Sequence, residues 1–156
     1  MKLFLMKTED EHVLELVRIS KAAFESDVLV RASIGDVPPQ YDSVEWHIEM
    51  KDKGHLFTAI ADEKIVGGAI IFPDENNETV YIGRIFVDPA EFKKGYGMAI
   101  MNGVETHVLA GRRVHGFFDF KNRKNLKFRK VHKVFEERNT LCAFRKDSFG
   151  INLAQW

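Results

Sequence analysis

Two glycines separated by one residue follow a pair of lysines in the segment Lys93-Lys94-Gly95-Tyr96-Gly97-Met98. An apolar stretch that ends at Asp88-Pro89 precedes this segment, and apolar residues at helical spacing follow it. The first turn of a helix has backbone N–H groups without an intrahelical partner, and it carries partial positive charge. Glycine has no Cβ, which lets the backbone approach a ligand closely. The pattern therefore predicts a strand, a loop and a helix N-terminus that together bind a phosphate or a diphosphate.

The composition is typical of a globular protein. The chain has 156 residues, of which 45% are apolar and 29% are charged, and its formal net charge is zero. We expect a single domain, residues 1–156. No apolar run approaches the roughly 20 residues that a membrane span needs, so we expect no membrane partner. Residues 1–7 are too short an apolar stretch for a signal peptide, and we expect a first strand there.

The residues that bind metals show no pattern. Six histidines and one cysteine, Cys142, are scattered along the chain without paired ligand spacing, and we therefore predict no metal site. A lone cysteine cannot form an intramolecular disulfide. This favours a reducing compartment, and we expect the protein to be cytoplasmic.

Hydrophobic periodicity and turn residues predict the elements that must position the loop. Strands are expected at residues 1–7, 56–61, 65–72, 79–87, 113–120, 141–145 and 148–153. Helices are expected at residues 10–26, 43–54, 97–110 and 122–138, with Ser43 as an N-cap. Residues 27–42 are expected to be irregular, and residues 62–64 to form a hairpin turn. The fold class is α/β (α+β), with a mixed, mostly antiparallel sheet of about seven strands flanked by four helices.

This order of elements, together with the segment from Ile85-Phe86-Val87-Asp88-Pro89 to Met98, resembles the GCN5-related N-acetyltransferase (GNAT) family. The glycines resemble the family's (Gln/Arg)-x-x-Gly-x-(Gly/Ala) loop. The resemblance covers nearly the whole chain in element order and residues 81–105 in motif. It implies an acyl-CoA N-acyltransferase-like fold, with acetyl-CoA as the cofactor. It also implies direct transfer of an acetyl group, in a ternary complex, to a primary amine of a small molecule or a protein N-terminus.

The resemblance also implies which residues contact coenzyme A. The loop amides would bind the diphosphate, and the end of the strand before them would run beside the pantetheine arm. A main-chain N–H at the end of this strand would stabilise the developing oxyanion. The residues implied in cofactor binding are Ile85, Phe86, Val87, Lys93, Lys94, Gly95, Tyr96, Gly97, Met98, Asn125 and Lys130.

One departure from the family concerns the general acid. Family members often have a tyrosine in the last long helix, which protonates the leaving thiolate. In an alignment without gaps this position is Phe128, which has no proton to give. The departure supports an alternative function, a non-catalytic protein of the same fold that binds acyl-CoA as a ligand or sensor.

The acceptor amine must lose a proton before it attacks. Glu78 and Glu49 are candidates for the base, although a solvated surface position is the favoured explanation for each. Tyr41, in a loop beside Pro38-Pro39, and His47 are candidates for acceptor binding. Packing of the loop on the core is an equally good explanation for Tyr41.

Residues 121–133 contain seven lysines and arginines. A solvated helix face, contact with the 3′-phosphate of coenzyme A, and a nucleic-acid patch are the three explanations, in that order. No aromatic platform or recognised module supports nucleic-acid binding, and we expect none. The expected partner is a small-molecule or peptide amine, and the sequence leaves a homodimer open.

Overall fold

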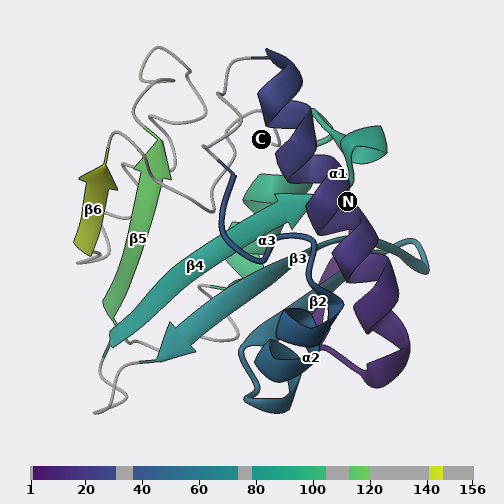
Figure 1. Cartoon of the computed structure of the whole chain (residues 1–156), viewed down its shortest axis with the longest axis horizontal. Coiled ribbons are helices and arrows are strands. Elements are labelled where there is room, and N and C mark those ends of the chain that lie inside the picture. Colours follow the sequence, from purple (N-terminus) through teal and green to yellow (C-terminus); the bar gives the residue numbers. More distant parts are fainter. Residues whose placement is uncertain (1, 31–36, 74–78, 105–112, 120–140, 146–156) are drawn as a thin grey trace.

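The computed structural model describes residues 2–30, 37–73, 79–104, 113–119 and 141–145. In this part of the chain six strands form one sheet, in the order β1-β2-β3-β4-β5-β6 (Figure 1). The strands are β1 Leu3–Lys7, β2 Leu56–Ala61, β3 Lys64–Pro73, β4 Thr79–Val87, β5 Arg113–Asp119 and β6 Leu141–Arg145. The helices are α1 Val13–Val30, α2 Val44–Asp52 and α3 Tyr96–Gly103, with short 3-10 turns η1 Asp10–His12 and η2 Pro89–Glu91.

The sheet is mixed, as predicted. Strands β1 to β4 pair with their neighbours in an antiparallel manner, whereas β4 with β5 and β5 with β6 are parallel. A parallel pair needs a crossover connection, and α3 lies in the connection between β4 and β5. The predicted helix at residues 122–138 and the predicted strand at residues 148–153 lie outside the described residues.

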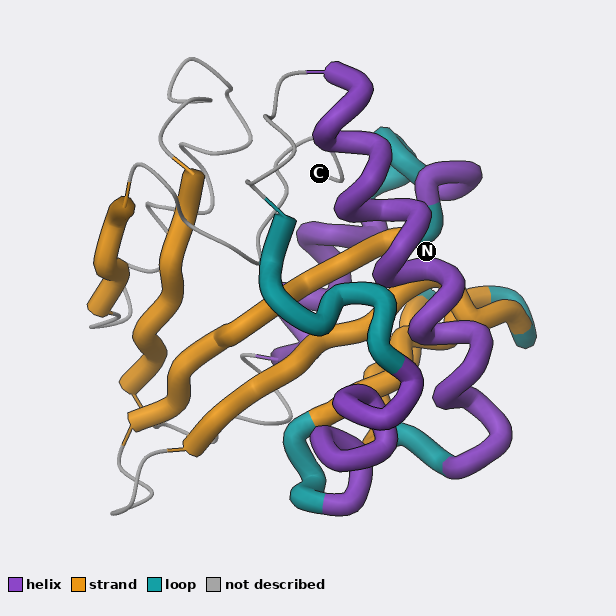
Figure 2. Tube along the Cα trace, in the orientation of Figure 1, coloured by secondary structure: helices purple, strands orange, loops and turns teal. Residues whose placement is uncertain are grey.

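Helices cover both faces of the sheet (Figure 1). Helix α1 contacts β3 and β4 on one face and also packs against α2, whereas α3 contacts β1, β3 and β4 on the other. The loop before α2 crosses the α1 face in front of the central strands (Figure 2). None of the described helices has both the length and the apolar character that crossing a membrane requires.

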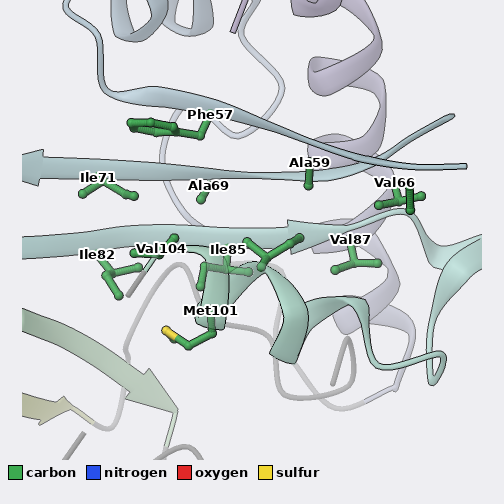
Figure 3. Close-up of a cluster of buried hydrophobic side chains, with 12 residues drawn as sticks. Phe57, Ala59, Val66, Ala69, Ile71, Ile82, Ile85, Val87, Met101 and Val104 are labelled. Carbon is green, nitrogen blue, oxygen red and sulfur yellow. The ribbon is translucent and has the colours of Figure 1, made fainter. Parts of the chain in front are cut away.

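Each face has its own apolar cluster. On the α3 face the buried side chains are those of Phe57, Ala59, Ala61, Val66, Ala69, Ile71, Ile82, Ile85, Val87, Ile100, Met101 and Val104 (Figure 3). On the α1 face they are those of Leu16, Ile19, Ala23, Phe24, Met50, Leu56, Ile70 and Phe86. Burial of this apolar surface on both sides of the central strands is the main source of stability for the domain.

A bulge in β4 decides which of its side chains face α3. Ile82 and Arg84 pair with consecutive residues of β3, so Gly83 is one residue extra on β4. In a regular strand Ile82 and Ile85 would lie on opposite faces, because side chains alternate. The bulge places both in the cluster under α3 (Figure 3). A Cβ at Gly83 would lie 2.5 Å from the Phe72 ring, which explains the glycine.

Local sequence signals predicted several boundaries correctly. The Ser43 hydroxyl accepts a hydrogen bond from the Trp46 N–H at 3.2 Å, so Ser43 is the N-cap of α2. Strands β2, β4 and β6 have the predicted bounds. The hairpin turn is one residue shorter than predicted. Asp62 and Glu63 alone form it, with φ of 49° and 62°, as a two-residue turn that matches the twist of its strands.

The prediction for the first helix was wrong at both ends. Residues 10–12 form the 3-10 turn η1, and α1 continues to Val30, through residues that were expected to be irregular. The helix continues because no glycine or proline occurs before Gly35.

Gly67 and Gly68 lie at a bulge and at a close approach between strands. The register between β2 and β3 shifts by one residue directly beside them. A Cβ at Gly67 would lie 2.3 Å from the Phe86 carbonyl oxygen, and one at Gly68 would lie 2.8 Å from the Phe57 carbonyl oxygen. Side chains larger than hydrogen would force β3 away from its neighbours.

The Gly67→Ala variant should therefore lose about 2–3 kcal/mol of unfolding free energy, because the added methyl group overlaps backbone atoms. This corresponds to a fall in Tm of roughly 5–10 °C for a domain of this size, measured by circular dichroism. The control is Gly103→Ala, whose Cβ would lie 3.3 Å from the Leu5 Cβ, a much milder contact than the 2.3 Å at Gly67. Equal melting temperatures for the two variants would contradict the close approach.

Candidate active site

The end of β4 leads into a short, well-defined turn. The Asp88 carboxylate accepts a hydrogen bond from the Ala90 N–H at 3.0 Å and so caps η2, which Pro89 opens. After η2 the chain turns through Lys93 and Gly95, whose φ angles of 64° and 86° lie in the left-handed region. Gly95 is the N-cap of α3. The predicted strand, loop and helix N-terminus are therefore all present.

The backbone N–H groups of residues 93–98 have no hydrogen-bond partner within the described part of the chain. The hydrogen bonds that flank this stretch are Phe92 N–H to the Pro89 carbonyl at 3.2 Å and Ala99 N–H to the Gly95 carbonyl at 3.0 Å. Consecutive free N–H groups at a helix N-terminus attract an anion, and the helix dipole adds to the attraction. The predicted cofactor residues from Lys93 to Met98 lie together on this loop and in the first turn of α3.

An ion pair between the buried carboxylate of Asp88 and the exposed guanidinium of Arg18 holds the start of this turn. Asp88 is 5% exposed, and its Oδ2 accepts a hydrogen bond from the Arg18 guanidinium of α1 at 2.5 Å. Arg18 also pairs with Glu15. Burial raises the pKa of Asp88, but the hydrogen bonds from Arg18 and from the Ala90 N–H outweigh it and hold this pKa below its ordinary value. Asp88 is therefore ionised near neutral pH.

The two lysines of the loop differ in their partners. The Lys94 ammonium donates to Glu91 Oε2 at 2.6 Å, and the Lys64 ammonium donates to Glu91 Oε1 at 2.6 Å. These two hydrogen bonds, that from Lys64 above all, lower the pKa of Glu91. The Lys93 side chain is exposed, and the described residues offer it no ion-pair partner.

Strands β4 and β5 diverge beside the loop. Their ladder pairs Thr79 to Ile82 with Arg113 to Gly116 and ends there. Beyond that point β5 continues beside β6, while β4 turns away toward α1 (Figure 1). Ile85, Phe86 and Val87, the strand residues predicted to contact the cofactor, lie in this diverging half of β4. All three residues are buried, Ile85 and Val87 in the cluster on the α3 face and Phe86 in the cluster on the α1 face.

The candidate acceptor residue Tyr41 lies against α1. Its hydroxyl donates to Glu25 at 3.1 Å, and its carbonyl accepts a hydrogen bond from the Ser20 hydroxyl at 2.7 Å. Its ring meets the edge of Phe24, with centroids 6.5 Å apart. Partial burial and then the Glu25 carboxylate raise the pKa of Tyr41, so the phenol stays protonated.

The second acceptor candidate, His47, is fully buried. Its Nδ1 lies 2.7 Å from the Ser43 carbonyl oxygen and donates to it, which leaves the lone pair on Nε2. The ring meets Phe86 edge to face, with centroids 6.5 Å apart. Burial lowers the pKa of His47, so the ring is neutral. In this structure His47 does not reach the surface, and an acceptor could not touch it directly.

The other predicted residues are less informative. Glu49 is exposed on α2 and pairs with Lys53. Glu78, Asn125, Phe128 and Lys130 lie outside the described residues. Arg84 was not among the predicted site residues, yet it is only 7% exposed and lies over the Trp46 ring at 4.2 Å. It also donates to the Pro39 carbonyl and so connects the loop before α2 to β4.

One group of side chains among the described residues could meet at a metal ion. The ligand atoms of Glu9, Glu11 and His12 lie within 4.8 Å of one another. Both glutamates are exposed, and exposed acidic groups are common without a bound ion. This group lies in and beside η1, before α1, and shares no residue with the loop.

Comparison with known proteins identifies the fold and the family. The model of a family described as "Acetyltransferase (GNAT) family" matches residues 15–133, which include both the loop and the diverging strand. The chain belongs to the GNAT acetyltransferase family. The resemblance seen in the motif and in the element order is thereby confirmed, and so is the GNAT-like α/β fold.

Solved GNAT structures share the fold at low sequence identity. A PaiA N-acetyltransferase from Thermoplasma acidophilum, in complex with coenzyme A, matches with a TM-score of 0.62 at 14% identity, over 86% of this chain and 89% of that one. The diaminobutyrate acetyltransferase EctA from Paenibacillus lautus, in complex with L-2,4-diaminobutyric acid and coenzyme A, matches with a TM-score of 0.60 at 14% identity. That match covers 87% of this chain and 75% of EctA.

A relative with higher identity matches over a shorter segment. The UPF0039 protein C11D3.02c of Schizosaccharomyces pombe is 48% identical over 48 residues. The match spans 31% of this chain and 31% of the yeast protein, about a third of each.

The Asp88–Arg18 ion pair leads to a prediction about acid stability. Because the pKa of Asp88 is lowered in the folded state, the ion pair stabilises the protein above the ordinary Asp value of 3.8. This contribution is lost as the pH falls from that value through the lowered pKa. Asp88→Asn keeps a side chain that can cap η2 but removes the charge. We expect it to lose about 1 kcal/mol of unfolding free energy at pH 7.

The measurement is urea unfolding of wild type and Asp88→Asn at pH 7 and near pH 3.5. The variant should lose less stability than wild type between these two values. Glu15→Gln is the control, because its exposed pair with Arg18 should contribute little. An unchanged acid dependence in Asp88→Asn would show that the ion pair does not stabilise the strand end.

Proposed function

We propose that this GNAT protein is an acetyl-CoA-dependent N-acetyltransferase. The observation that carries the proposal is the run of N–H groups at residues 93–98 without a partner in the described part of the chain. They lie where β4 gives way to α3, and Lys93 adds an exposed positive charge. Family membership supports acetyl transfer as the reaction class. The coenzyme A in the solved structures of PaiA and EctA supports acetyl-CoA as the donor.

The diphosphate of coenzyme A would lie on the loop, with the pantetheine arm along the diverging half of β4. There the ladder to β5 has ended, and the arm would run beside the backbone of Ile85, Phe86 and Val87 in the manner of an added strand. Asn125 and Lys130, outside the described residues, are proposed as further contacts. Cofactor binding would thus depend on backbone groups more than on side chains.

The reaction is direct attack of a neutral amine on the thioester carbonyl, without a covalent enzyme intermediate. A main-chain N–H near the end of β4 would donate to the oxygen of the carbonyl as negative charge develops on it. Glu78 and Glu49 remain candidates for the base that takes the amine proton. Because Phe128 cannot protonate the leaving thiolate, we expect turnover roughly 10²–10⁴ times slower than with a general acid.

The acceptor is proposed to be the primary amine of a small molecule or of a protein N-terminus. The complex of EctA with L-2,4-diaminobutyric acid supports a small amine. Tyr41 is the better placed of the two acceptor candidates, because it is half-buried whereas His47 is fully buried. The lone cysteine supports a reducing, cytoplasmic location.

The test is incubation with acetyl-CoA and a panel of primary amines, with free thiol measured over time. We expect thiol release that depends on one class of amine. Coenzyme A should also raise the Tm, because a ligand that binds only the folded state stabilises it. Binding without thiol release for any amine would favour the alternative, a non-catalytic acyl-CoA sensor. Failure of coenzyme A to raise the Tm would contradict both functions.

The loop makes a further prediction about cofactor affinity. Gly97→Glu should abolish binding of coenzyme A, because it places a bulky carboxylate among the N–H groups that hold the diphosphate. An acidic side chain in the first turn of a helix is favourable, but Gly97 is buried, so the Tm of the free variant is needed to show that the fold survives. Gly95→Glu should act in the same way, but with added backbone strain at a φ of 86°.

The measurement is isothermal titration calorimetry with coenzyme A, together with the Tm of the free variants. Asn102→Glu is the matched control, because it adds the same charge to an exposed position in the second half of α3. It should bind nearly as tightly as wild type. Retained affinity in both glycine variants would show that the phosphates bind elsewhere.

A further inference from the structure

Glu91 lies between two lysines next to the loop. Its side chain is 11% exposed, and each of its carboxylate oxygens accepts a hydrogen bond from one lysine at 2.6 Å. Lys64 is the first residue of β3, and Lys94 is part of the loop itself. The three side chains therefore connect the loop to the β2–β3 hairpin, across a sequence separation of 27 residues between Glu91 and Lys64.

The same corner of the hairpin is joined to the strand end by the backbone. The Asp88 N–H donates to the Val66 carbonyl at 2.8 Å, two residues beyond Lys64. The hairpin is thus attached to Asp88, before η2, through the backbone, and to Glu91, the last residue of η2, through Lys64, while Lys94 binds Glu91 in turn. A loop fixed at two points keeps its N–H groups in one arrangement, which reduces the entropy lost on binding.

The charges of the two loop lysines are consequently not equivalent. The carboxylate of Glu91 compensates the ammonium of Lys94 at hydrogen-bond distance. Lys93 has no such partner among the described residues, its side chain is exposed, and it lies between Phe92 and Lys94 with a φ of 64°. A left-handed conformation at a lysine is unfavourable, so the loop keeps this residue at some cost in stability.

We infer that the two lysines have different tasks: Lys93 neutralises the bound diphosphate, whereas Glu91 and Lys64 hold Lys94 as a positioning residue that keeps the loop in its binding shape. This inference rests on the proposed function, because it takes the ligand to be coenzyme A. In this inference Glu91 favours binding of the diphosphate, although its own charge is negative and lies beside the anion site.

The sign of the effect at Glu91 tests the inference. If charge alone mattered, Glu91→Gln would tighten binding, because it removes a negative charge near the phosphates and releases Lys94. If Glu91 positions the loop, the variant should bind coenzyme A more weakly, by about fivefold, because part of the preorganisation is lost. Calorimetry with coenzyme A at low ionic strength measures the difference, and the Tm without ligand shows that the variant is folded.

The matched pair Lys93→Gln and Lys94→Gln separates the two tasks. Lys93→Gln should weaken binding about fivefold at low salt, an effect that should fade in 0.5–1 M salt at a Debye length of about 3–4 Å. Its effect should be the same with and without Glu91→Gln. Lys94→Gln should weaken binding in wild type but add nothing in the Glu91→Gln background, because the two residues act as one unit.

Three results would overturn the inference. The first is tighter binding of coenzyme A by Glu91→Gln than by wild type, and the second is a larger loss of affinity from Lys94→Gln in the Glu91→Gln background than in wild type. The third is that Lys93→Gln and Lys94→Gln reduce the affinity equally and additively. If wild type itself binds no coenzyme A, the proposed function fails and the inference fails with it. If wild type binds and the lysines behave alike, only the division of tasks is wrong.

Discussion

The arrangement of the site depends on one buried carboxylate, Asp88, at the end of the central strand. Its side chain binds Arg18 on α1 and caps η2, while its N–H donates to the Val66 carbonyl of β3. A helix, a strand and a turn thus meet at a single residue. A buried carboxylate without partners would cost much free energy. The strand must therefore end where Asp88 can reach its partners. The N–H groups that follow are presented from a fixed position.

Most of the groups that would bind the cofactor belong to the backbone, so binding would depend little on the identity of the side chains. The bulge at Gly83 keeps Ile82 and Ile85 in the same apolar cluster, and the half of β4 beyond Ile82 is no longer paired with β5. Such a site requires particular residues mainly in the turn between β4 and α3. It is consistent with shared architecture between this chain and GNAT structures that are only 14% identical to it.

Local signals in the sequence were sufficient for the loop and for several elements around it. Asp88-Pro89, the two glycines and the apolar run of β4 predicted the strand end and the start of α3, because capping and turn chemistry act over a few residues. Interactions between distant residues were not predictable in this way. Arg18 and Asp88 are 70 residues apart, and the bulge at Gly83 depends on the register with β3. The burial of His47 likewise depends on tertiary packing. Helix α2 has exposed positions as well as buried ones, and its sequence alone does not decide which kind His47 occupies.

The left-handed backbone of Lys93 implies a conflict between folding and affinity. Glycine at this position would relieve strain and make the isolated domain more robust, yet it would remove the one uncompensated cation of the loop within the described part of the chain. Selection for thermal stability alone would therefore favour glycine or asparagine at position 93. Selection for high affinity toward an acetyl donor present at low concentration would retain lysine.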